Sequence, residues 1–194
     1  MTQNDEITIV IVSYKSKNKI SNFLKGLKIN FRVIIIENSD DLSIKHEISK
    51  ISKNIEIYFT GNIGYGSSAN FARKKINTKY FFLFNPDLTG VDNFMIKYFL
   101  DYAKKVNDNF SCLGPRYENI SEKTLKQSNI KDEMGFINAI SGAAMFFNAK
   151  NFDSIGGFDE NIFLYFDETD YCKRGKKLNL YSYQLNMIKI SHDV

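Results

Sequence analysis

Three carboxylates lie close together in the segment "FLYFDETDYCKR" (Phe163–Arg174). Asp167, Glu168 and Asp170 follow directly on a run of aromatic side chains. Acidic groups at this spacing can begin a helix, because they cap its free N–H groups and complement the positive end of its dipole. A carboxylate can also act as the general base that removes a proton from an attacking hydroxyl group. The segment therefore has a structural and a chemical interpretation.

A second set of polar residues follows the apolar runs of the first half of the chain. These residues are Ser13 and Tyr14, Glu37 to Ser39, the loop from Gly61 to Gly66, and Asn85 to Asp87. If the runs are parallel strands, all four sets share the carboxyl edge of one sheet, where ligands bind in open α/β folds. This shared edge is the strongest purely physical indication of a site.

Each member of this set also has a simpler interpretation as a turn. The glycines Gly61, Gly64 and Gly66 permit either a tight turn or the close approach of a phosphate. The loop matches neither the dinucleotide fingerprint nor the Walker motif, which needs Gly-Lys-Ser/Thr. Asp87 is suited to hold a divalent cation, because Mg²⁺ takes only one or two protein carboxylates in addition to substrate phosphates.

The elements that would carry these residues alternate between strands and helices. Runs of β-branched and aromatic residues predict buried strands, and apolar residues three and four apart predict helices. The strands are expected at Ile7–Tyr14, Phe31–Ser39, Ile55–Thr60 and Tyr80–Phe84, and the helices at Asn18–Lys28, Ser43–Ser52, after the glycine loop, and at Val91–Val106. This order predicts an α/β fold with a mostly parallel central sheet flanked by helices.

The second half of the chain is less regular. We expect a polar loop over Glu118–Glu133 and a strand over Ile137–Phe147 that Gly142 interrupts. A short helix ending at Gly156 and Gly157, a helix over Glu168–Leu178 and a strand over Leu180–His192 complete the pattern. We interpret residues 1–194 as one domain with two unequal halves, 1–115 for a nucleotide and 116–194 for a further substrate.

Composition excludes several classes of function. The chain has 194 residues, 43% of them apolar, and a net charge of +4 without a run of basic residues, so nucleic-acid binding is not expected. No segment reads as a signal peptide or a transmembrane helix. Cys112 and Cys172 lack the spacing of a zinc site and are expected as reduced thiols. These features predict a cytoplasmic protein, with a charge compatible with peripheral contact at the inner face of the plasma membrane.

Several segments together resemble a known family. They are "IVIVSYKS", "IIIENSDD", "GNIGYGSSANFA", "FFLFNPDL", "ISGAAMFF", "IGGFDENIFLYFDETDYCKR" and the closing "ISH", which occur in this order from Ile7 to His192. In this order they resemble family 2 glycosyltransferases with the GT-A fold, especially the bacterial rhamnosyltransferase-like branch. The resemblance implies a nucleotide-sugar-binding first half and an acceptor-binding second half.

The resemblance also implies roles for individual residues. Nucleotide-binding residues would be Ser13, Tyr14, Glu37, Asn62, Gly64, Asn70 and Asn85; Asp87 and His192 would hold Mg²⁺ or Mn²⁺; and Gly142, Gly157, Phe158 and Asp159 would face the acceptor. The family's catalytic motif reads Glu-Asp-x-Asp, whereas here the first two acids are exchanged. The matching base is Glu168, with Asp167 in reserve, and Tyr165 or Phe166 would line the sugar pocket.

The function implied by the resemblance is an inverting, metal-dependent sugar transfer. The donor would be a nucleoside-diphosphate sugar, dTDP-rhamnose-like or a UDP-sugar, and the acceptor a hydroxyl of a glycan or lipid-linked glycan in bacterial surface-polysaccharide synthesis. Two alternatives stay open: a non-catalytic or degenerate nucleotide-sugar-binding domain, and a sugar nucleotidyltransferase. The latter needs a glycine-rich basic loop after the first strand, and "KSKNK" (Lys15–Lys19) has no glycine. Many family members continue past the last histidine, so we expect this chain to lack a C-terminal extension.

Overall fold

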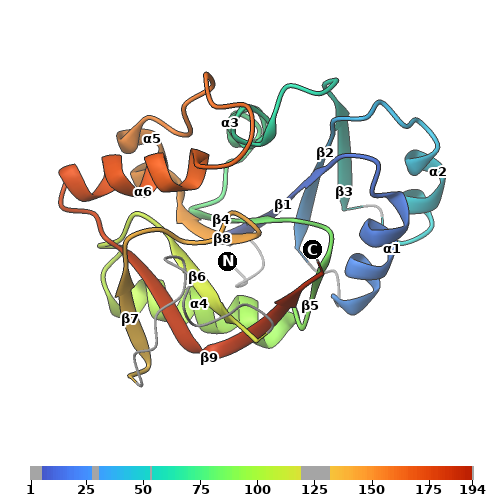
Figure 1. Ribbon diagram of the computed structural model, residues 1–194. Helices are drawn as coiled ribbons and strands as arrows, with labels where there is room; N and C mark the ends of the chain where they lie inside the picture. The colour runs from blue at the N-terminus through green and yellow to red at the C-terminus, as the bar shows by residue number, and fades with distance from the viewer. Residues whose placement is uncertain (1–5, 28–30, 53, 119–131, 194) are drawn as a thin grey trace.

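The computed structural model describes residues 6–27, 31–52, 54–118 and 132–193 (Figure 1). Its strands are β1 (Ile7–Ser13), β2 (Arg32–Glu37), β3 (Ile55–Phe59), β4 (Tyr80–Phe84), β5 (Leu88–Thr89), β6 (Leu113–Tyr117), β7 (Met134–Ile137), β8 (Ala144–Asn148) and β9 (Ser182–His192). Its helices are α1 (Lys17–Gly26), α2 (Ile44–Ser49), α3 (Tyr65–Arg73), α4 (Asn93–Lys105), α5 (Ala149–Ile155) and α6 (Asp167–Lys177).

One sheet joins the two halves of the chain in the order β3-β2-β1-β4-β8-β6-β9-β5, with β7 paired to β9. The four strands of the first half are parallel, and their register places Ser13 opposite Glu37. The predicted meeting of strand ends at one edge is therefore confirmed. The second half is mixed: β8 is antiparallel to β4 and β6, and β9 runs parallel to β6 but antiparallel to β5 and β7.

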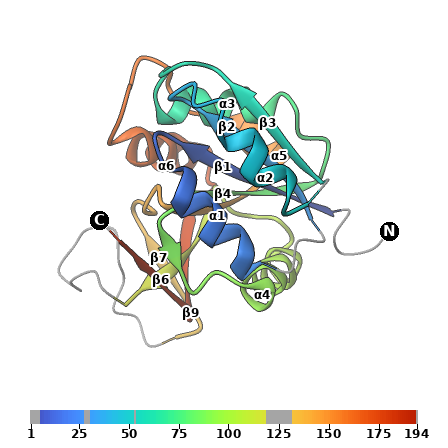
Figure 2. The same cartoon turned by 90° about the vertical axis from the view of Figure 1, so that its right-hand side faces the viewer.

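The buried strands have one helix layer on each face (Figures 1 and 2). Successive side chains of a strand point to opposite faces. Ile9 and Ile11 of β1 pack in a cluster with residues of α1, α2 and α4, whereas Val10 and Val12 pack with residues of α3, α5 and α6. This three-layer arrangement explains the continuous apolar runs and confirms the α/β prediction with flanking helices.

The second half departs from the expected elements in two places. The segment predicted as one interrupted strand over Ile137–Phe147 forms the end of β7, a connection that contains Gly142, and most of β8. The short strands β5 and β6 were not predicted, because β5 has only two residues and β6 contains Gly114 and Pro115, which argue against a strand. Most of the predicted loop at Glu118–Glu133 lies outside the described residues.

Candidate active site

A pocket of about 190 Å³ lies where the ends of β4 and β9 approach the start of α6. Its lining residues are Tyr65, Asn85, Ser141, Gly142, Ala143, Leu164, Tyr165, Asp167, Glu168 and His192. Both halves of the chain contribute to it. The structure thus brings together five residues expected from the sequence to lie in the site, Asn85, Gly142, Asp167, Glu168 and His192, together with Tyr165.

The start of α6 differs from the sequence prediction. Asp167 is the first residue of the helix, and the N-cap residue is Phe166, which has a left-handed backbone (φ 66°) and makes no side-chain cap. The predicted capping role of Asp167 is therefore wrong, because Asp167 lies within the helix rather than before it, and its side chain is buried at the pocket. Asp170 does lie in the first turn, where its Oδ2 accepts a 2.7 Å hydrogen bond from Arg174 Nε.

The two buried acids face different neighbours. Asp167 and Glu168 are 2% and 3% exposed. A Cβ atom on Gly142 would lie 3.9 Å from Glu168 Oε2, whereas a Cβ atom on Gly66 would lie 3.4 Å from Asp167 Oδ2. Glu168 is therefore directed to the connection between β7 and β8, and Asp167 Oδ2 is directed to α3.

Asp167 is held in its protonated form up to neutral pH. Burial raises the pKa of its carboxyl to about 7, and hydrogen bonding and repulsion from Glu168 act in the same direction. Its Oδ2 atom has no hydrogen-bond partner among the described residues. A buried acid without a cation beside it favours the neutral form, because removing a charge from water is costly.

Tyr65 connects the start of α3 to the opposite wall of the pocket. Its hydroxyl donates a hydrogen bond to the carbonyl oxygen of Gly142. Burial raises the pKa of Tyr65 well above its ordinary value, and Asp167 adds to the effect. The hydroxyl therefore remains protonated and acts as a fixed donor that holds the wall beside Glu168.

Asp87 and His192 meet at the edge of the pocket. The antiparallel pairing of β5 and β9 places Leu88 opposite His192, and His192 Nε2 lies 3.1 Å from Asp87 Oδ1. Lys19 Nζ lies 3.2 Å from the other carboxylate oxygen. Burial alone would raise the pKa of Asp87, but the hydrogen bonds from His192 and Lys19 outweigh it and hold the pKa below its ordinary value.

This donor set fits a divalent cation that also binds a substrate. Among the described residues, no group of three or more His, Cys, Asp and Glu side chains could hold a metal ion. Asp87 and His192 offer one carboxylate and one imidazole, a set that suits Mn²⁺ or Mg²⁺ only if phosphate oxygens and water complete the coordination. A cavity of about 310 Å³, bordered by Lys19, Asp87 and Asp193, adjoins this position and provides space for such a ligand.

The predicted base-contacting residues lie at the strand ends. Ser13 Oγ donates a 2.6 Å hydrogen bond to Glu37 Oε2, and the Ser39 N–H donates a 2.8 Å bond to Glu37 Oε1. Both Ser13 and Glu37 are buried, whereas Tyr14 and Asn62 are exposed at the same edge. The Glu37 carboxylate is thus fixed by its neighbours at the carboxyl edge of β2.

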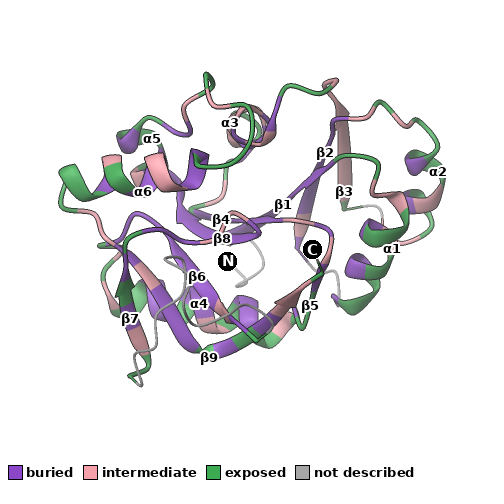
Figure 3. Cartoon of the chain, viewed as in Figure 1, coloured by how far each residue is buried: buried purple, intermediate pink, exposed green. Residues whose placement is uncertain are grey.

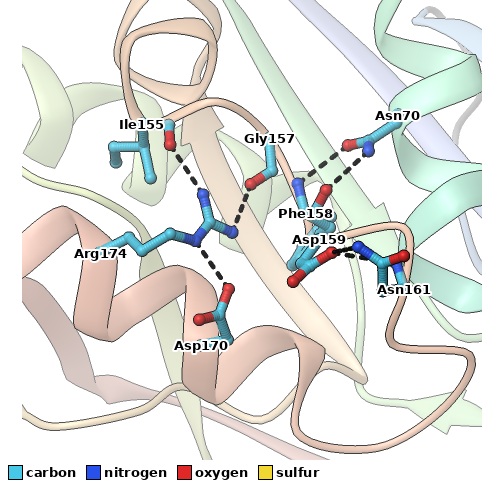
Figure 4. Close-up of polar contacts among 8 residues, drawn as sticks. All are labelled: Asn70, Ile155, Gly157, Phe158, Asp159, Asn161, Asp170 and Arg174. Atoms are coloured by element: carbon cyan, nitrogen blue, oxygen red, sulfur yellow. Dashed lines mark hydrogen bonds and ion pairs between the residues drawn. The ribbon is translucent and has the colours of Figure 1, made fainter.

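Two predicted ligand-binding residues of α3 contact the second half of the chain. Gly64 has φ 89°, and a Cβ atom there would lie only 2.5 Å from the carbonyl oxygen of Phe163. The Asn70 side chain donates a 2.9 Å hydrogen bond to the Phe158 carbonyl and accepts a 3.0 Å bond from the Phe158 N–H (Figure 4). In this structure both residues fasten the segment before α6 to α3.

Three of the predicted acceptor residues lie outside the pocket. Phe158 is buried in the core, Asp159 accepts hydrogen bonds from Asn161, and Gly157 borders a separate cavity beside Asn70. Arg174 donates to the carbonyl oxygens of Ile155 and Gly157 (Figure 4). These contacts fix the path of the chain into α6, and with it the position of Glu168.

Sequence reasoning missed five residues at the site: Tyr65, Ser141, Ala143, Leu164 and Lys19. Tyr65 lies within the glycine loop from Gly61 to Gly66, so its place in that loop could have indicated a role at the site. Lys19 belongs to a lysine-rich segment that carried no indication of its partner. The contacts of Tyr65 with Gly142 and of Lys19 with Asp87 are long-range, and such contacts leave no periodic pattern in a sequence.

The two cysteines are close in space, although 60 residues separate them. Their sulfur atoms are 3.6 Å apart, both residues are buried, and both are free thiols. Burial raises the pKa of the Cys112 thiol well above its ordinary value. Cys172 lies one turn of α6 after Glu168, so this contact ties the helix to the start of β6.

Known proteins resemble this chain in sequence. The low-salt glycan biosynthesis hexosyltransferase Agl10 of Haloferax volcanii is 22% identical over 99% of this chain and 68% of its own length. The rhamnosyltransferase WbbL of Escherichia coli K12 is 23% identical over 97% of this chain and 82% of its own length. No protein-family model matches the sequence.

Solved structures resemble it in fold. The mannosyltransferase PcManGT of Pyrobaculum calidifontis, in complex with GDP-Man and Mn²⁺, aligns with a TM-score of 0.77 at 8% identity. TarS of S. aureus, in complex with UDP-GlcNAc, aligns with a TM-score of 0.68 at 14% identity. The alignments cover 98% and 93% of this chain but only 57% and 58% of those proteins. The chain thus spans a little over half of their length.

Among the described residues, no helix is both long and apolar enough to cross a membrane.

Proposed function

We propose that the chain is a glycosyltransferase that transfers a sugar from a nucleoside-diphosphate sugar to a hydroxyl group of a glycan acceptor, with inversion at the anomeric carbon, as its similarity to GT-A glycosyltransferases supports. The observation that carries the proposal is the pocket that Glu168 of α6 lines together with His192 and Asn85 from the strand ends. This arrangement provides a base and a leaving-group site within one active site.

Glu168 is the proposed base. Its carboxylate faces Gly142, which has no side chain and so leaves room for an acceptor hydroxyl. As the hydroxyl oxygen attacks the anomeric carbon, its proton passes to a Glu168 oxygen, a transfer that general bases typically accelerate by about 10²–10⁴-fold. Asp167, which is directed to α3 and holds its proton, lies beside this base.

Asp87 and His192 are the proposed residues for the departing diphosphate. A divalent cation bound there offsets the negative charge that grows on the leaving group. Lys19 adds a positive charge at the same carboxylate, 3.2 Å from Asp87 Oδ2. Asp87 borders the larger cavity, whereas Glu168 lines the smaller pocket, so the base and the leaving group have separate places. This separation supports attack from the face opposite the diphosphate.

The names of two relatives support a proposal for the substrate class. One curated relative is named for glycan biosynthesis and the other for rhamnosyl transfer. We therefore infer a dTDP-rhamnose-like or UDP-sugar donor and a glycan or lipid-linked acceptor of surface-polysaccharide synthesis, with the reaction at the cytoplasmic face of the membrane. Of Mg²⁺ and Mn²⁺, the imidazole of His192 favours Mn²⁺, since Mg²⁺ binds oxygen ligands.

Donor screening tests the proposal directly. Melting temperatures are measured with UDP-, dTDP- and GDP-sugars, each with and without Mn²⁺, because a ligand that binds only the folded state raises the melting temperature. The donor that stabilises most is then incubated with sugar acceptors, and NMR reports the anomeric configuration of the product. Metal-dependent stabilisation with an inverted product is expected. Stabilisation without any transfer would favour the binding-domain alternative, and no stabilisation by any donor would contradict the proposal.

A further inference from the structure

The segment Phe163–Phe166 exposes four consecutive apolar side chains at the mouth of the pocket. These side chains are between 50% and 72% exposed. Leu164 and Tyr165 line the pocket itself, whereas Phe163 and Phe166 do not. We call this segment the aromatic lip. A contiguous apolar patch on a soluble domain typically marks a surface that binds a partner.

The backbone holds these side chains outward. The Phe163 carbonyl accepts a 3.1 Å hydrogen bond from the Tyr65 N–H, which fastens the lip to the start of α3. Tyr165 and Phe166 both have left-handed backbones, with φ of 64° and 66°. Such conformations are unfavourable for bulky residues and commonly occur at ligand-binding positions. The same turn directs Asp167 and the next acid inward, so the outward aromatic residues and the buried acids result from one backbone feature.

Positive charge continues from the lip along α6. The helix buries Asp167, Glu168, Tyr171, Cys172 and Gly175. At 100° per residue, Lys173 and Lys177 lie on the opposite face of α6, and both are exposed. Figure 3 shows the segment before α6 and the far end of α6 in the colour of exposed residues. Lys176, beside this row, is exposed as well.

We propose that the aromatic lip and these lysines dock on an anionic lipid membrane. Phe and Tyr side chains partition to the boundary between headgroups and acyl chains, and lysines attract anionic headgroups. Apolar residues at one end of an exposed ridge and exposed lysines at the other match that surface, and the acid between them, Asp170, is paired with Arg174. The inference rests on the proposed function, since docking would bring the sugar of a lipid-linked acceptor to the pocket that contains Glu168.

Vesicle co-sedimentation of the chain, without donor, tests this docking. Vesicles of 70% phosphatidylcholine and 30% phosphatidylglycerol are compared with pure phosphatidylcholine. The double variant Phe163→Ser with Phe166→Ser is expected to bind anionic vesicles at least tenfold more weakly. Its matched control is Phe94→Ser with Met187→Ser, because these residues are 67% and 68% exposed on α4 and β9. Circular dichroism confirms that each variant is folded.

The lysines have a separate test. Lys173→Ala with Lys177→Ala is expected to weaken binding to anionic vesicles several-fold in 50 mM salt and to have little effect in 500 mM salt, because salt screens exposed charges. Lys25→Ala with Lys97→Ala, at exposed positions on α1 and α4, is the control. If both double variants lose vesicle binding equally, the assignment of α6 to the docking surface is overturned.

Three further results would overturn the docking proposal. They are absence of wild-type binding at 1 mM lipid, concentration-dependent self-association that the Phe163/Phe166 variant abolishes, and a changed KM for a water-soluble glycan acceptor with unchanged vesicle binding. The second result would indicate a contact between copies, and the third a sugar-binding surface. Vesicle binding does not require turnover, so a chain that docks without transferring sugar would contradict only the proposed function.

Discussion

His192 Nε2 lies 3.1 Å from Asp87 Oδ1, although 105 residues separate the two in the sequence. The last strand must pair antiparallel with the short strand β5 for this contact to form. Asp87 borders the larger cavity and His192 lines the pocket that contains Glu168. The pair therefore links the proposed leaving-group side of the site to the proposed acceptor side.

Asp87→Ala and His192→Ala are each expected to weaken Mn²⁺-dependent nucleotide binding by tenfold or more, because each variant removes one of the two proposed protein ligands. Calorimetry with and without Mn²⁺ measures the effect. His46→Ala, at an exposed position on α2, is the matched control. Binding that remains equally metal-dependent in Asp87→Ala would rule out this metal site.

Lys19→Met is expected to strengthen the binding of Mn²⁺ in the absence of nucleotide. Lys19 neutralises Asp87 Oδ2 from 3.2 Å, so a cation must compete with it. The gain should not exceed about fivefold, since a half-exposed ion pair contributes about 0.2–1 kcal/mol. Titration of Mn²⁺ followed by electron paramagnetic resonance measures it, with Lys17→Met as the control. Weaker binding in Lys19→Met would contradict the competition.

Glu168→Gln is expected to lower kcat by at least about 100-fold while donor affinity changes little, because the amide cannot accept the proton. Asp170→Asn is the matched control within the same acidic cluster. Asp170 binds Arg174, so its variant should lose thermal stability but keep most of its turnover. Substantial turnover in Glu168→Gln would transfer the role of base to Asp167.

Asp167 should make the stability of the chain depend on pH. The folded protein retains this proton up to about pH 7, whereas an ordinary aspartate releases it near pH 3.8. The contribution of this carboxyl to the free energy of unfolding is therefore fully present below about pH 3.8 and is lost as the pH rises through 7. Asp167→Asn should lack this loss and be more stable than the wild type at pH 8, by an amount of the order of a few kcal/mol, since each pKa unit corresponds to about 1.4 kcal/mol. Urea unfolding at pH 5 and pH 8 compares the two proteins, and the same pH dependence in both would refute the assignment.

Two glycines at the site should respond differently to alanine. Gly64→Ala places a Cβ atom 2.5 Å from the Phe163 carbonyl at φ 89°, so we expect a loss of about 2 kcal/mol or more. Gly142→Ala meets nothing closer than 3.7 Å, so its free energy of unfolding should change by less than about 0.5 kcal/mol. Urea unfolding measures the free energy of unfolding of both variants. Similar losses in the two would show that the contact with Phe163 does not cause the loss in Gly64→Ala.

The sequence predicted the sheet edge correctly because that edge depends on local patterns. Continuous apolar runs require strands buried on both faces, and the polar residues that end them must then gather at one edge. Ser13 and Glu37 meet there as this reasoning requires. The ordered motifs likewise indicated the family resemblance and the GT-A fold, because they extend along nearly the whole chain.

The tertiary structure alone decided what each polar residue contacts. The order of the acids does not show that Glu168 faces Gly142 while Asp167 faces Gly66, nor does a lysine-rich segment show that Lys19 reaches Asp87. Nor does the glycine loop show that Gly64, expected beside a nucleotide, gives space to the Phe163 carbonyl. Periodicity records only whether a residue is buried or exposed in its own element. Pairing across about a hundred residues depends on how whole layers pack, and that packing fixed the orientation of the acids and the outward position of the aromatic lip.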